Sequence, residues 1–71
     1  MFSDREIAAQ TIERVKGILG DLDQLLVVIE PTVADEEYRN CKNAVGHVMA
    51  EVFERLAEPI AAAHPELRYW A

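Results

Sequence analysis

The sequence lacks the cross-links that stabilise many small proteins. Its single cysteine, Cys41, excludes an intrachain disulfide, and no Cys/His cluster is present that would form a structural zinc site. With 71 residues, the chain lies near the size at which one hydrophobic core only just offsets the conformational entropy of folding. We therefore expect a single domain over residues 1–71 that gains stability by assembling with another chain.

Long apolar runs and basic residues are also scarce. The longest strongly apolar stretch, residues 25–29, is far too short to cross a bilayer, and the first residues do not resemble a signal peptide. Seven Lys and Arg residues against 13 Asp and Glu residues give a net charge of -6, which opposes binding to phosphate backbones and anionic lipid. We expect a soluble cytoplasmic protein with no nucleic-acid partner and no membrane partner.

Glycine and proline occur only three times each, so two long segments run between the few turn signals. The first predicts a helix over about residues 4–30, capped by Ser3 or Asp4 and stopped by Pro31. Its apolar residues recur at spacings of three and four, and three more widen the stripe to roughly 140°. The first set is Ala8, Ile12, Val15, Leu19, Leu22, Leu26 and Ile29, and the second is Ile7, Ile18 and Leu25.

Two glycines lie within this first segment, on the side opposite the apolar stripe. Gly17 and Gly20 each cost about 1 kcal/mol relative to alanine in a helix interior. One interpretation is a break, with Gly20 ending one helix and Asp21 capping the next. The unbroken apolar register favours a continuous helix with a bend near Gly20.

The second segment predicts a helix over about residues 33–58, with Thr32 as its N-cap and Asp35 at the third position. Pro59 is expected to kink or restart the helix, giving a short helix over about residues 59–64, and Pro65 begins a tail over residues 65–71. The apolar face of the second helix comprises Ala34, Tyr38, Cys41, Val45, Val48, Val52 and Leu56, flanked by Met49, Phe53 and Ile60.

The short connection between the helices predicts an all-α fold, an antiparallel helical hairpin. Each arm covers about half of its neighbour's stripe, so we expect a homodimer that forms a four-helix bundle. In an antiparallel dimer, the aromatic tail of one chain would reach Val27 and Val28 of the other. The expected interface comprises Ile12, Val15, Leu19, Leu22, Leu26, Val27, Val28, Tyr38, Cys41, Val45, Val48, Val52, Leu56, Tyr69 and Trp70.

The sequence offers little catalytic or metal-binding chemistry. His47, Glu51 and Glu54 share one helical face, but this is the polar face, and a solvated surface explains them better than a metal site. Cys41 lies on the apolar seam and is interpreted as a packing residue, while His64 is interpreted as a helix C-terminal cap. Ser3 is the only serine, and Gly17 to Gly20 lack the pattern of a phosphate loop. We expect no enzyme activity, no cofactor and no metal.

The leading hypothesis is a non-enzymatic homodimeric module that binds and modulates a larger protein. Such hairpin dimers occur among small bacterial and phage-encoded regulators, with which the chain shares only a general layout. A second hypothesis is a subunit that completes a hetero-oligomeric helical bundle. A third is an acidic inhibitor that masks a basic nucleic-acid-binding surface, and a fourth is a small ligand or metal carrier.

Overall fold

The first helix, α1 (Arg5–Ile29), is continuous through both of its glycines, as the apolar register indicated. The structure, a computed structural model, describes residues 1–70. Asp4 is the N-cap: its carboxylate accepts the backbone N–H groups of Glu6 and Ile7 at 2.8 and 3.3 Å. No glycine adopts a positive φ, so neither Gly17 nor Gly20 breaks the helix.

A 3₁₀ turn at Glu30–Thr32 ends α1 and holds Pro31. The expected N-cap role of Thr32 is wrong, because its hydroxyl donates backwards to the Ile29 carbonyl at 2.8 Å. Ala34 occupies the N-cap position of α2 (Asp35–Val52), and the Glu37 carboxylate accepts the Ala34 backbone N–H at 3.1 Å. Thr32 thus accepts no backbone N–H of α2 and bonds to the end of α1, while Glu37 caps the start of α2.

Pro59 lies in the first turn of a new short helix, which confirms the predicted restart, and a widened helical turn precedes this helix. Residues Phe53–Ala57 form a π-helical turn, and α3 (Glu58–Ala63) follows it with Pro59 in its first turn. The Glu58 N–H reaches back five residues to the Phe53 carbonyl. Because a π turn inserts one residue into the helix, it relieves the loss of the proline N–H while the chain continues in helical form.

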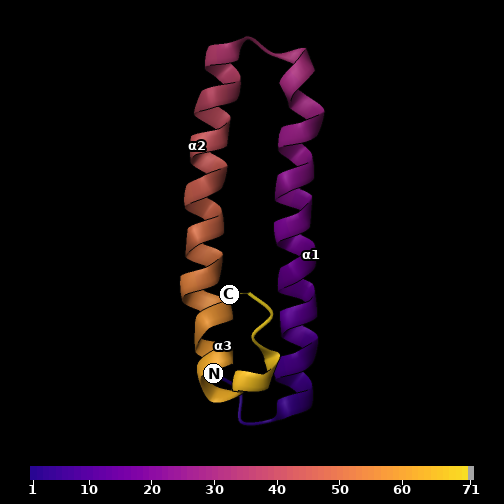
Figure 1. Cartoon of the computed structure of the whole chain (residues 1–71), viewed down its shortest axis with the longest axis vertical. Coiled ribbons are helices and arrows are strands. Elements are labelled where there is room, and N and C mark those ends of the chain that lie inside the picture. The colour runs from indigo at the N-terminus through magenta and orange to yellow at the C-terminus, as the bar shows by residue number, and fades with distance from the viewer. Residues whose placement is uncertain (71) are drawn as a thin grey trace.

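The two long arms run antiparallel, which confirms the predicted all-helical hairpin (Figure 1). The molecule measures 46 × 18 × 16 Å. A 3₁₀ turn, Pro65–Leu67, follows α3 and directs the tail back along the hairpin at the end opposite the loop, where in this view it overlies the region between the arms (Figure 1). This end therefore has a third layer that the two arms alone would not supply.

The core is confined to the end of the hairpin that carries the chain termini. Its buried cluster is Ala8, Ile12, Val15, Leu19, Ala57 and Ile60, and the partly buried residues packed on it are Met49, Val52, Phe53, Leu56, Leu67 and Trp70. Between residues 20 and 44 no side chain is fully buried. The half of the hairpin next to the loop is thus held by two partly packed helices.

Candidate interaction face

A row of half-exposed apolar side chains runs along one side of α1. Ile7, Ile18 and Leu25 are 48%, 47% and 43% exposed, and each directly precedes a core or seam residue, namely Ala8, Leu19 and Leu26. On α2, Val48 is 49% exposed and precedes the partly buried Met49. Exposed Ala44 stands in the same relation to buried Val45.

These residues from the two helices lie on one face of the hairpin. An antiparallel helix pair has an approximate two-fold axis perpendicular to the plane that contains both helices. Rotation about this axis exchanges the two helices but keeps each side of the plane where it is. A residue that directly precedes a core position therefore projects from the same side of the plane on both helices. We call Ile7, Ile18, Leu25, Ala44 and Val48 the open face. It extends along much of the length of the arms and is covered by nothing in the single chain.

The aromatic tail contacts its own chain. The Trp70 and Phe53 rings meet edge to face with centroids 5.5 Å apart, and the Trp70 indole N–H donates to a Glu58 carboxylate oxygen at 3.0 Å. Lys16 lies 4.8 Å above the Tyr69 ring. Lys16 and Phe53 each follow a core position, so the tail covers the face opposite the open face. These contacts differ from those expected across a dimer with Val27 and Val28.

The fifteen residues of the expected interface fall into three groups. Ile12, Val15, Leu19 and Val45 are buried within the single chain. Leu22, Leu26, Tyr38, Cys41, Val52, Leu56 and Trp70 are partly buried, while Val27, Val28, Val48 and Tyr69 are exposed. The central seam therefore closes the hairpin itself, and the side chains left for a partner are those at the edge of the stripe. The sequence identified Ile7, Ile18 and Leu25 as residues that widen the apolar stripe. Their position at the edge of the stripe distinguishes them from the residues buried inside the hairpin.

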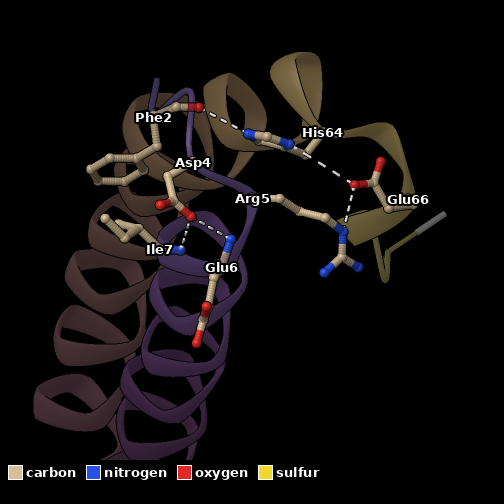
Figure 2. A network of polar contacts seen from close by, with 7 residues as sticks. All are labelled: Phe2, Asp4, Arg5, Glu6, Ile7, His64 and Glu66. Atoms are coloured by element: carbon tan, nitrogen blue, oxygen red, sulfur yellow. Dashed lines mark hydrogen bonds and ion pairs between the residues drawn. The ribbon is translucent and has the colours of Figure 1, made fainter.

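A polar network ties the two ends of the chain together (Figure 2). His64 lies at the C-cap position of α3, as predicted, and its backbone N–H donates to the Ile60 carbonyl at 2.9 Å, while its imidazole turns to the start of the chain. Its ring Nε2 lies 2.9 Å from the Phe2 carbonyl oxygen, so Nε2 carries the proton and donates. Its Nδ1 lies 3.9 Å from Glu66 Oε1, which also accepts from Arg5 Nε at 3.0 Å.

This network fixes the segment that precedes α1. Phe2 has a φ of 62°, a left-handed conformation that costs a non-glycine residue about 1–2 kcal/mol. The hydrogen bond from His64 to its carbonyl offsets part of that cost. A hydrogen bond from its own backbone N–H and the Arg5 guanidinium hold the pKa of Glu66 below its usual value of 4.5. We call His64, Glu66, Arg5 and the Phe2 carbonyl the terminal network.

Beside the loop, an open depression is lined by Glu30, Asp35, Tyr38, Arg39 and Lys42. A hydrogen bond to Glu30 raises the pKa of the Tyr38 phenol. The lining mixes both signs of charge, so it offers no concentrated field for an ion or a reacting group.

Within residues 1–70, no three His, Cys, Asp or Glu side chains gather into a potential metal site. His47 and Glu54 stay exposed, and Glu51 pairs with Arg55 on the helix surface. Over the same residues, no helix is long and apolar enough to cross a membrane. No known protein family, no curated protein and no solved structure matches the chain. The geometry alone therefore supports the functional argument.

Proposed function

We propose that the chain is a non-enzymatic interaction module that dimerises through its open face into a four-helix bundle and binds a larger protein. The observation that carries this proposal is the open face itself, with four large apolar side chains 43–49% exposed along one side of the hairpin. Exposed charged residues that also precede seam positions, such as Arg14, Asp21 and Glu51, flank these apolar side chains, and exposed apolar side chains rimmed by polar residues mark an interaction site.

The total exposed area points in the same direction. A compact monomer of 8.0 kDa is expected to expose about 4,450 Å², whereas this chain exposes 5041 Å². The excess, about 600 Å², belongs to the elongated shape of the hairpin, 46 × 18 × 16 Å, which leaves room for a standard interface, in which each partner buries roughly 800 Å². A second copy would supply a matching apolar face without any other component.

The dimer is tested by sedimentation equilibrium on matched variants. We expect the native chain to have the mass of a dimer and Ile18→Asp to be monomeric, because a carboxylate in the middle of the open face loses its hydration on association. Val27→Asp is the control: Val27 is 66% exposed but follows the seam residue Leu26, so it lies on the other face. A folded native monomer at all concentrations would overturn the proposal. So would a molten chain that folds only with a different protein, which would identify a hetero-oligomeric subunit.

Val27 also offers a surface for the larger partner. It lies near the loop, beyond the level at which Tyr69 stacks on Lys16, and so stays outside both the open face and the tail. We expect Val27→Asp to remain dimeric and to lose capture of the partner that the native chain binds in its host. Retained capture would exclude this part of the loop end as the binding surface.

A further inference from the structure

We propose that the two copies meet in antiparallel orientation, α1 on α1 and α2 on α2, about a two-fold axis between the two Ile18 side chains. This inference rests on the proposed dimer and specifies its geometry. The open face and the charges at its edges carry it.

The centre of the open face follows from which residues of α1 and α2 lie at the same height along the hairpin. α1 ends at Ile29 and α2 begins at Asp35, on either side of the loop, and both rise about 1.5 Å per residue. Ile18 of α1 therefore lies level with about Gly46 of α2. Ile18, Ala44 and Val48 form the apolar middle of the open face.

Charged residues at the edge of α1 are placed symmetrically about this centre. Arg14 and Asp21 lie four residues before and three residues after Ile18, on the same outer side of the helix. Neither side chain makes an ion pair within residues 1–70. Antiparallel pairing of α1 about Ile18 brings Arg14 of each copy beside Asp21 of the other, so the contact occurs twice.

On α2, an acidic and a basic residue lie on the same side of the helix as Val48, within the open face. Glu37 and Arg55 lie nine residues before and nine residues after Gly46. Antiparallel pairing of α2 about Gly46 thus brings Glu37 of each copy toward Arg55 of the other. Within one chain, Glu37 accepts the Ala34 N–H and Arg55 pairs with Glu51, so this α2 contact would have to displace those bonds. The Arg14–Asp21 contact is therefore the one that indicates the axis, because complementary charge of this kind sets the register of an interface.

The same arrangement pairs the apolar residues at the two ends of the face. Ile7 and Ile29 lie eleven residues before and after Ile18, so Ile7 of one copy meets Ile29 of the other. Val28, 58% exposed, lies at the edge of that contact. A parallel arrangement would instead place α1 over the partner's α2 and set the Glu37 carboxylate level with the apolar stretch 25–29, where it would lose hydration with no cation opposite.

Disulfide trapping tests the orientation. In a Cys41→Ala background, Ile18→Cys is expected to give a covalent dimer on mild oxidation, because the two-fold axis brings these side chains together. Leu25→Cys is the matched control: it is equally exposed, but it faces Thr11 of the other copy and so is expected to stay uncrosslinked. A native dimer in which Ile18→Cys does not crosslink overturns the antiparallel geometry and leaves the proposed dimer intact. A monomeric native chain overturns both.

A charge-reversal cycle tests the register. We expect Arg14→Asp or Asp21→Arg alone to raise the dimer Kd by roughly tenfold, since two like-charge contacts replace two ion pairs, and the double variant to restore most of the affinity. Arg39→Asp, which reverses an exposed cation away from the open face, is the control and leaves the Kd unchanged. Restoration of Arg14→Asp by Glu51→Arg instead of Asp21→Arg would identify the parallel arrangement and overturn the inference.

Discussion

At the scale of single residues, Gly17 and Gly20 occupy helix positions with no packing reason for the absence of a side chain. A Cβ atom built at either position meets nothing within 4 Å, and the same holds for Gly46 in α2. Both glycines of α1 lie away from the open face and from the buried seam. Their cost in helix stability is therefore not offset by any contact within the chain.

We expect Gly17→Ala and Gly20→Ala each to raise the free energy of unfolding by about 0.5–1 kcal/mol, because alanine restricts the unfolded chain and adds no clash. Urea unfolding at a fixed protein concentration measures the change, with Gly46→Ala as the comparison in the other arm. If stability rises while capture of the larger partner is lost, another backbone approaches α1 at these glycines. A fall in stability would contradict the open space at these positions.

The carboxylate of Glu66 gives the terminal network a defined pH dependence. Its pKa is lowered in the folded chain by its own backbone N–H and by Arg5, so the ionised form is favoured by folding. The resulting stability is present above the unfolded pKa and is lost as the pH falls through the folded pKa.

We therefore expect the urea midpoint of the native chain to fall as the pH decreases below about 4.5. The urea midpoint of Glu66→Gln should fall less over the same pH range, since the amide carries no charge to lose. Arg5→Gln removes the cation beside Glu66 and should make the fall of the urea midpoint with pH partly smaller. Identical pH profiles for the native chain and Glu66→Gln would contradict a stabilising role for this network.

At the scale of elements, the π turn and α3 determine where the core can form. The wide turn at Phe53–Ala57 leaves Ala57 and Ile60 fully buried against the α1 residues Ala8 and Ile12. The tail then closes over Phe53 through Trp70. Pro59, which the sequence predicts to kink or restart the helix, thus lies at the start of the short helix that completes the core at one end.

We expect Trp70→Ala to lower the free energy of unfolding by about 2 kcal/mol, because it removes a partly buried ring from Phe53 together with its hydrogen bond to Glu58. Tyr69→Ala, at an exposed ring that lies under Lys16 and meets Trp70 edge to face, should cost less than about 1 kcal/mol. Deletion of residues 66–71 is expected to act in the same direction as Trp70→Ala. Equal effects of the two single substitutions would show that the tail is not anchored by Trp70.

At the scale of the whole molecule, the helical hairpin could be predicted because the apolar period, Pro31 and the capping carboxylate are all local signals. Residue-by-residue periodicity also placed Ile12, Val15 and Leu19 on the inner side, where they are buried. The division of the stripe between the hairpin core and the open face could not be predicted. It depends on where α3 and the tail pack, and those contacts join residues far apart in the sequence, such as Phe2 with His64 and Lys16 with Tyr69.

The confinement of the core to one end of the hairpin has a consequence for how the chain opens. Local unfolding requires the least free energy where few apolar groups are buried, which here is the stretch from residue 20 to residue 44. The arms should therefore separate first at the loop end, while the cluster around Ile60 and the terminal network stay closed. In a single chain, the amide protons near the loop would exchange with solvent well before those of the core. An antiparallel dimer would reduce this gradient, because each loop half then lies against the well-packed half of its partner.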